Sequence, residues 1–323
     1  MRRLLFVLAL VVALGAGYLA VGAVGWAAIT AVNGDCMAIN GDQSPGTFDA
    51  RWGGVTELDA APYRFTDARD VAFPSLTPGL ELRAWWAPPT NPAAGAVVVV
   101  HGRNSCRHDP AVLLPAGMLH KNGFGVLLLD LRNHGTSDTE NGHWGGGTDE
   151  WQDVLGAWHW LRGQGYPAAS IGLLGLSMGA GAVVYAIGEE PAVAAAWLDS
   201  PYADIVSMSI DVAANPLQKV FAPGALLMGQ LIGGDDFLGP SPVQVLVEHL
   251  DGRPLAIVHG TADTTIPVEQ GEQLAAAAAR GGTPVTPWII TGARHVESAF
   301  VAPAEYERRV TAFFRKNLAP PKP

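Results

Sequence analysis

The sequence predicts an α/β fold with a mostly parallel central sheet, helices on both faces and an N-terminal transmembrane helix. Short apolar runs alternate with amphipathic segments from about residue 80 to residue 317, a rhythm typical of a parallel sheet covered on both sides. Ala96–Val100 reads Ala-Val-Val-Val-Val, the continuous apolar run expected of a doubly buried strand. A segment without charged residues, Leu4–Ala31, precedes them.

The elements follow from these patterns in order. Strands are expected at Leu80–Ala87, Ala96–Val100, Gly125–Asp130, Ile171–Gly175, Val193–Leu198, Pro254–His259 and Val285–Ile290. Helices are expected at Pro110–Asn122, Asp149–Arg162, Met178–Gly188, Val268–Arg280 and Ala304–Asn317. Between residues 200 and 253 no clear strand occurs, which predicts a lid-like insertion. Ordinary packing of this segment against the sheet is the alternative.

The uncharged N-terminal run is longer than the apolar region of a cleaved signal peptide. Its length suits a membrane anchor, since a bilayer core needs about 20 apolar residues. Arg2 and Arg3 precede it, and acidic residues beginning with Asp35 follow it. The positive-inside rule then places the rest of the chain outside the cytoplasm. The small residues at Ala20–Ala23 could still offer a cleavage site, which would release a secreted protein.

Composition narrows the function. The formal net charge is −10 and 49% of residues are hydrophobic, so a globular core is expected and nucleic acid is not an expected partner. Cys36 and Cys106 could pair in an oxidising compartment, and two unpaired thiols are the alternative.

The chemistry centres on Gly175-Leu176-Ser177-Met178-Gly179. This G-x-S-x-G motif lies between a predicted strand and a predicted helix, the setting of a nucleophile elbow. The turn is so tight that glycine is needed at Gly175 and Gly179. A serine hydroxyl needs a base to take its proton, so Ser177 is the candidate nucleophile.

The base and the acid are sought after strands downstream of Ser177, because open α/β sheets place catalytic groups at the carboxyl ends of strands. His295 follows the last predicted strand and is the candidate base. Asp263 follows the strand that ends at His259 and is the candidate acid, with Asp199 as the alternative. His259 is expected to brace the loop.

The oxyanion hole requires two backbone N–H groups. Met178, directly after the nucleophile, and Arg103, after the segment His101-Gly102, are the candidates. The side chains of Arg103, Arg107 and His108 are expected to be solvated, and contact with an anionic group is the alternative.

Together these motifs resemble the α/β-hydrolase superfamily over about residues 75–317, and more narrowly Bem46-type hydrolases and stand-alone relatives of the prolyl-oligopeptidase catalytic domain. The carrying segments are His101-Gly102, Asp130–Ser137, Gly175–Gly179, Asp199-Ser200-Pro201, His259–Asp263 and His295. The resemblance implies an α/β-hydrolase fold and hydrolysis of an ester, thioester or amide through an acyl-enzyme, without metal or organic cofactor. His101-Gly102-Arg103-Asn104 lacks the glycine run of HGGG-type esterases.

The expected protein is a serine esterase, carboxylesterase-like or lipase-like, acting on small-molecule or lipid-like esters. A peptidase or amidase, an acyltransferase and a non-catalytic surface binding protein are the alternatives. The expected organisation is an anchor or signal at 1–33, a linker with entry strands at 34–74, a catalytic domain at 75–318 with the insertion at 200–253, and a tail at 319–323.

Overall fold

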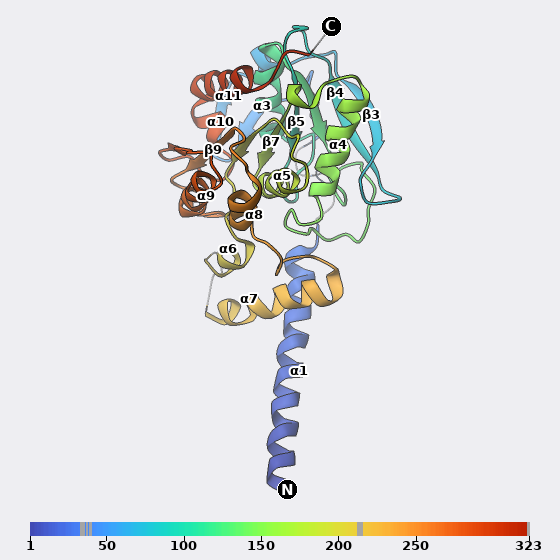
Figure 1. Cartoon of the computed structure of the whole chain (residues 1–323), viewed down its shortest axis with the longest axis vertical. Helices are drawn as coiled ribbons and strands as arrows, with labels where there is room; N and C mark the ends of the chain where they lie inside the picture. The colour runs from blue at the N-terminus through green and yellow to red at the C-terminus, as the bar shows by residue number, and fades with distance from the viewer. Residues whose placement is uncertain (33–35, 37, 39–40, 212–215, 322–323) are drawn as a thin grey trace.

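The computed structural model describes residues 1–32, 36, 38, 41–211 and 216–321. A long helix, α1 (Arg2–Thr30), projects from a layered domain (Figure 1). The expected junction at residues 33–35 and the last two residues of the tail lie outside the described part. α1 is long and apolar enough to cross a membrane, as the sequence predicts.

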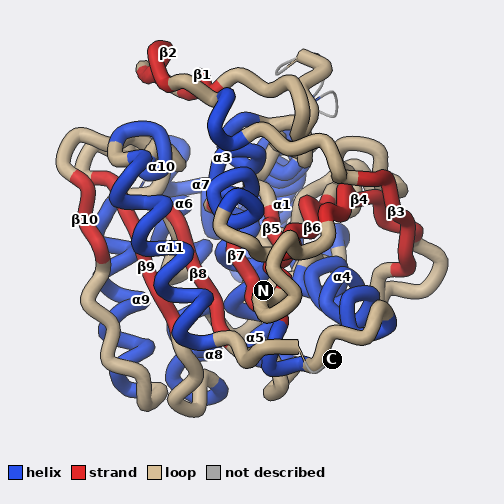
Figure 2. The backbone as a smooth tube through the Cα atoms, turned by 90° about the horizontal axis from the view of Figure 1, so that it is seen from above, coloured by secondary structure: helices blue, strands red, loops and turns tan. Residues whose placement is uncertain are grey.

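The sheet has eight strands in the order β10-β9-β8-β7-β5-β6-β4-β3 (Figure 2). β5, β6, β7, β8, β9 and β10 pair in parallel, while β4 and β3 run antiparallel at one edge. The bounds are β3 Arg69–Pro74, β4 Glu81–Ala87, β5 Ala96–Val100, β6 Gly125–Leu129, β7 Ile171–Leu176, β8 Ala195–Asp199, β9 Leu255–Gly260 and β10 Trp288–Ile290. A separate hairpin joins β1 (Ala50–Trp52) to β2 (Val55–Leu58).

Two hydrophobic cores cover the two faces of the sheet because successive strand residues point to opposite sides. Val98 and Val100 of β5 belong to one core, and Val97 and Val99 belong to the other. The first core includes residues of α4 (Trp151–Gly163), α5 (Met178–Glu189), α8 (Pro242–His249) and α9 (Val268–Arg280). The second includes residues of α3 (Pro110–Lys121), α10 (Ser298–Val301) and α11 (Pro303–Asn317).

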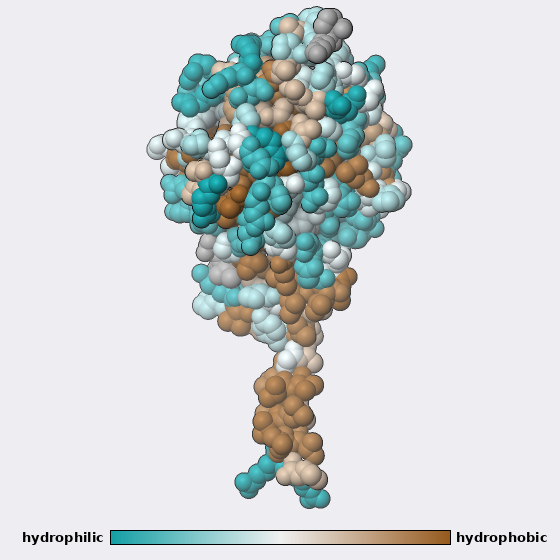
Figure 3. Space-filling view, viewed as in Figure 1, coloured by the Kyte–Doolittle hydropathy of each residue, from teal (hydrophilic) through white to brown (hydrophobic). Residues whose placement is uncertain are grey.

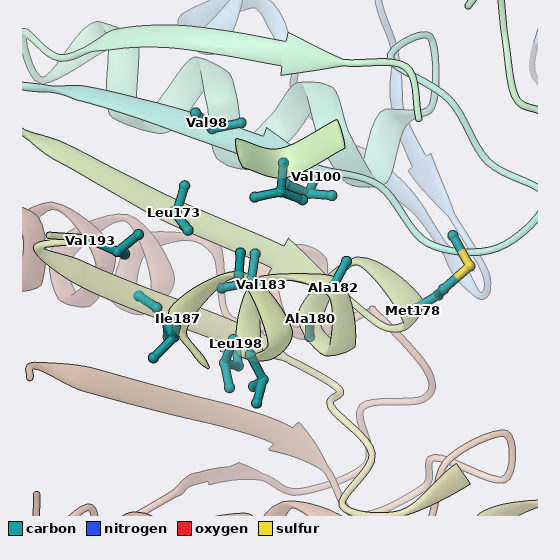
Figure 4. Close-up of a cluster of buried hydrophobic side chains, with 14 of the residues drawn as sticks. Val98, Val100, Leu173, Met178, Ala180, Ala182, Val183, Ile187, Val193 and Leu198 are labelled. Atoms are coloured by element: carbon teal, nitrogen blue, oxygen red, sulfur yellow. The ribbon is translucent and has the colours of Figure 1, made fainter. Parts of the chain in front are cut away.

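The helix that follows the nucleophile is buried by small side chains. α5 presents Ala180, Ala182 and Val183 to the sheet, and all three are fully buried. Figure 4 shows them among Val98, Leu173 and Leu198 of three adjacent strands. Small residues bring the helix axis close to β7, and this closeness permits the sharp turn at Ser177.

The insertion at residues 200–253 divides into two parts. α8 packs against α5 and α9 within the main layer. α6 (Ile205–Asp211), α7 (Pro216–Met228) and a π-helical segment, η3 (Gly229–Gly233), extend away from the sheet, and α7 lies across α1 (Figure 1). A lid function for the second part stays a prediction.

A disulfide joins Cys36 to Cys106, with 6.0 Å between their Cα atoms. It ties the segment after α1 to the loop between β5 and α3. Disulfides persist in oxidising compartments, so the bond agrees with the predicted export of the domain.

We expect the Cys36→Ser/Cys106→Ser variant to lose about 4 kcal/mol of unfolding free energy, because the bond closes a 70-residue separation whose unfolded entropy it restricts. Urea unfolding of the full chain in detergent, followed by tryptophan fluorescence, measures the loss. Reductant should lower the wild type to the stability of the variant and leave the variant unchanged. A variant as stable as the oxidised wild type would contradict the prediction.

Candidate active site

Ser177 occupies a strained turn between β7 and α5. Its φ of 54° and ψ of −119° lie in a region that L-residues rarely adopt. Side chains at the flanking positions are excluded, since a Cβ at Gly175 would strike the backbone of Gly179 and Ala180, and a Cβ at Gly179 would strike the carbonyl groups of Val100 and His101. The turn lifts the Ser177 side chain above the carboxyl edge of the sheet at the positive end of α5.

Ser177, His295 and Asp263 form one hydrogen-bonded chain. The Ser177 Oγ lies 2.8 Å from His295 Nε2, and His295 Nδ1 lies 2.8 Å from Asp263 Oδ2. With Asp263 accepting from Nδ1–H, Nε2 is left to accept the serine proton. The His295 side chain is 22% exposed and the Asp263 side chain is fully buried. Of these two groups, therefore, only the imidazole is accessible from outside. The three residues selected from the sequence therefore lie together.

Asp263 is held as a carboxylate by its loop. Burial alone raises the pKa of such a carboxyl group, but hydrogen bonds with His259 and His295 and the backbone N–H of Ile266 outweigh it and hold the pKa of Asp263 below its usual range. The backbone N–H groups of Thr265 and Ile266 donate to Oδ1 at 2.9 and 2.8 Å. His259 Nε2 donates to the Ile266 carbonyl at 2.8 Å and so braces the loop.

Asp199, the alternative acid, has a different environment. Ser298 Oγ donates to its Oδ1 at 3.0 Å, and its backbone carbonyl accepts the Ser177 N–H at 2.9 Å. Burial raises its pKa to about 6 against opposing hydrogen bonds from Ser298 and Tyr306. The two residues thus differ. The carboxyl group of Asp263 contacts the imidazole of His295, whereas the backbone carbonyl of Asp199 bonds to the turn at Ser177.

The loop after β5 runs beside the nucleophile. A Cβ at Gly102 would lie 3.1 Å from Ser177 Cβ and 3.6 Å from Ser177 Oγ. Among the described residues, no acceptor pairs with the backbone N–H of Arg103 or of Met178. Two free N–H groups near a serine hydroxyl are what a developing oxyanion needs.

His101 fixes that loop as a neutral ring. It is fully buried, its Nδ1 donates to the Gly102 carbonyl at 2.6 Å, and its Nε2 accepts the Leu131 N–H at 3.0 Å. Burial, together with nearby His134, lowers the pKa of His101 to about 3. His134 accepts the Asn104 N–H at 3.3 Å; no role of its own was predicted for this residue from the sequence, and its signal was its place in the segment Asp130–Ser137.

The expectation that nearby basic side chains are solvated is wrong for two of three. Arg107 is buried over the Trp85 ring and pairs with Asp130 and Asp70. His108 is buried and bonds to the Gln43 carbonyl at 2.7 Å. Such partners lie far apart in the sequence, so composition could not reveal them. Arg103 is exposed and its guanidinium lies 5.0 Å over the ring of Trp144.

In the described part of the chain, no three His, Cys, Asp or Glu side chains are arranged to hold a metal ion.

Comparisons with known proteins can now be set beside this geometry. Residues 91–232 match the family of serine aminopeptidases, S33. Curated proteins give no match. An esterase from Pyrococcus furiosus superposes with a TM-score of 0.62 at 23% identity, covering 90% of this chain and 99% of the esterase.

Two longer enzymes are also similar in structure. An acylaminoacyl peptidase from Pyrococcus horikoshii has a TM-score of 0.56 at 19% identity, over 78% of this chain and 41% of that one. A puromycin-hydrolyzing peptidase from Mycobacterium tuberculosis has a TM-score of 0.61 at 21% identity, over 82% and 42%. The chain spans less than half the length of either peptidase.

The fold is therefore the α/β-hydrolase fold, as predicted. The family match over residues 91–232 indicates, more particularly, a serine hydrolase.

The burial of His101 predicts a pH dependence of stability. Because its folded pKa of about 3 lies below the unfolded value of about 6.5, the unfolded chain binds a proton between these values that the folded chain does not. The contribution of His101 to the free energy of unfolding is therefore fully present above about pH 6.5 and is lost as the pH falls toward 3. Between pH 7 and pH 5 the expected loss is about 2 kcal/mol.

Urea unfolding of the full chain at pH 7 and pH 5 measures this loss. We expect His101→Gln to reduce the difference between the two pH values, whatever its effect at pH 7. His249→Gln, at an exposed histidine, should leave the difference unchanged. Equal differences in wild type and His101→Gln would count against the prediction.

Proposed function

We propose that this protein is a membrane-anchored serine hydrolase that cleaves carboxylic esters, with Ser177 as nucleophile, His295 as general base and Asp263 as orienting acid. The observation that carries the proposal is the pair of 2.8 Å hydrogen bonds linking the three side chains. Serine, base and acid within hydrogen-bond reach are what nucleophilic catalysis requires.

In the proposed first step, Ser177 Oγ attacks the substrate carbonyl carbon while His295 Nε2 takes the hydroxyl proton. The N–H groups of Met178 and Arg103 stabilise the oxyanion. His295 then returns the proton to the departing alcohol, which leaves an acyl-enzyme. Water, deprotonated by His295, attacks the acyl carbon, and the carboxylic acid departs as the proton returns to Ser177.

Ester substrates are favoured by the similarity to the Pyrococcus furiosus esterase, which extends over 99% of that protein. The chain matches only 41% and 42% of the two peptidases. A lipophilic acyl group fits a protein whose N-terminal helix is apolar enough to cross a membrane. Amide hydrolysis is the second candidate, because the matching family is named for serine aminopeptidases.

One contact of α1, made by Tyr18, favours retention of the anchor over cleavage. The hydrogen bonds from Trp26 to Asp235 at 2.7 Å and from Trp144 to the Ile29 carbonyl at 2.9 Å would remain after cleavage near Ala20–Ala23. Cleavage near Ala20–Ala23 would remove Tyr18, whose hydroxyl donates to the Val220 carbonyl at 3.0 Å. With Arg2 and Arg3 in the cytoplasm, the proposed catalytic domain lies outside it.

The full chain in detergent should hydrolyse nitrophenyl esters, with a rate that rises from acetyl to longer acyl groups, and should act more slowly on an aminoacyl nitroanilide. Ser177→Ala should abolish the turnover while retaining the fold, which circular dichroism checks. Faster cleavage of the anilide would favour the amidase. Ester turnover that persists in Ser177→Ala would remove Ser177 as nucleophile.

The two aspartates give a matched comparison. We expect Asp263→Asn to lower kcat for the best ester by about 10⁴-fold, the loss seen when a serine triad loses its orienting carboxylate. Asp199→Asn removes an equally buried carboxyl group that bonds to Ser298 instead of His295, so its kcat should remain within an order of magnitude of wild type. A reversed ranking would make Asp199 the acid.

A further inference from the structure

The helix α7 is seated on the outer third of α1. The backbones touch where Gly22 meets Gly224, since a Cβ on Gly22 would lie 2.6 Å from the Gly224 carbonyl oxygen. Below this point the rings of Tyr18 and Phe221 stack with centroids 5.3 Å apart. The close approach of the two glycines and the stacking of the two rings fix the position of α7 along the axis of α1.

Several apolar side chains of α7 and η3 are open to the surface. Leu217, Val220, Leu231 and Ile232 are each more than half exposed, at 68, 59, 63 and 59%. From Pro216 to Gly233 the sequence holds one ionisable side chain, Lys219. Figure 3 shows the hydrophobic surface of α1 continuing onto the segment that carries α7. A patch of this kind is unusual on a surface that faces only water.

The length of α1 places this patch relative to a bilayer. A hydrocarbon core about 30 Å thick takes about 20 helical residues at 1.5 Å each. Counting from Leu4, directly after Arg3, the outer boundary of the core falls near Ala23. Gly22, the contact point of α7, lies one residue inside this boundary. A helix tilt of about 20° moves the boundary outward by about one residue and places α7 deeper.

We propose that α7 and η3 form a second membrane contact and lie in the outer interface of the bilayer with Leu217, Val220, Leu231 and Ile232 among the lipid chains. This inference rests on the anchoring by α1 proposed above. Three features favour lipid as the occupant: the depth set by Gly22, the continuity with the lipid-facing side of α1, and the position of Tyr18 and Trp26 on either side of the boundary, in the region where such side chains are enriched.

The end of α1 also connects, through Trp144, to the loop that carries the proposed oxyanion hole. Trp144 bonds to the carbonyl of Ile29 near the end of α1, and its ring carries the guanidinium of Arg103. Arg103 follows Gly102, which borders Ser177. The oxyanion loop is therefore linked through one tryptophan to the end of the anchor.

Spin labels on the full chain, one chain per phosphatidylcholine nanodisc, test the proposal. Labels at Leu217→Cys and Leu231→Cys report on the patch, Leu8→Cys on the span, and Glu248→Cys on a helix of the same insertion that points into water. The native disulfide stays oxidised, so only the new thiol is labelled. Power saturation compares collisions with oxygen, which concentrates in lipid, and with a water-soluble nickel chelate.

We expect the oxygen-to-nickel accessibility ratio at residues 217 and 231 to exceed that at residue 248 several-fold and to approach that at residue 8. If the ratio at residues 217 and 231 equals that at residue 248 while the ratio at residue 8 is high, the inference is wrong and the proposed anchoring by α1 is supported. If the ratio at residue 8 is also low, the proposed anchoring by α1 is wrong. A parallel measurement in vesicles tests for a second copy of this chain. Shielding of residue 217 from both reagents there, with spin–spin broadening that dilution by unlabelled chain relieves, would overturn the inference in favour of that second copy.

Discussion

The parallel pairing of β7, β8, β9 and β10 is the constraint on which the rest of the structure depends. Leu176 pairs with Asp199, Asp199 pairs with Val258, and Gly260 pairs with Ile290, so the four strands end almost level. Residues more than 100 positions apart in the chain therefore meet at one edge of the sheet. These strand ends are followed within a few residues by Ser177, Asp263 and His295. Short loops are therefore enough to bring the three side chains together.

The site separates two buried carboxyl groups by their surroundings. Asp263 receives hydrogen bonds from two backbone N–H groups and an imidazole, and the result is a lowered pKa. Asp199 receives hydroxyl hydrogen bonds that do not offset its burial, and its pKa is raised to about 6. A permanent carboxylate beside His295 can hold one imidazole tautomer and balance the charge of the imidazolium.

The end of the molecule that carries α1 is an extension of the same architecture. The insertion leaves the carboxyl end of β8, returns through α8 to the main layer, and on the way packs α7 on α1. Trp26, Tyr18 and Trp144 each use an apolar ring for packing and a polar atom for a hydrogen bond. The helix α1, the insertion and the loop after β5 are consequently one connected structure.

By itself the sequence determined the local features. Continuous apolar runs such as Ala96–Val100 predicted the buried strands, and Gly175–Gly179 predicted the turn at Ser177, because burial and steric exclusion act on neighbouring residues. The order of the motifs selected Asp263 and His295. Entry strands were predicted within residues 34–74, but the bounds of β1, β2 and β3 were not. β3 lies at the sheet edge and its residues are mostly exposed or half-buried, so its apolar pattern is weak.

Only the tertiary structure decided what depends on distant partners. It showed that Asp263, and not Asp199, contacts His295, that Cys36 reaches Cys106, and that Arg107 and His108 are buried against Trp85. It also placed α7 across α1, where Gly22 and Gly224 meet. Hydrophobic periodicity specifies which face of an element is buried, but the identity of the surface that covers it is set by the packing of the whole chain.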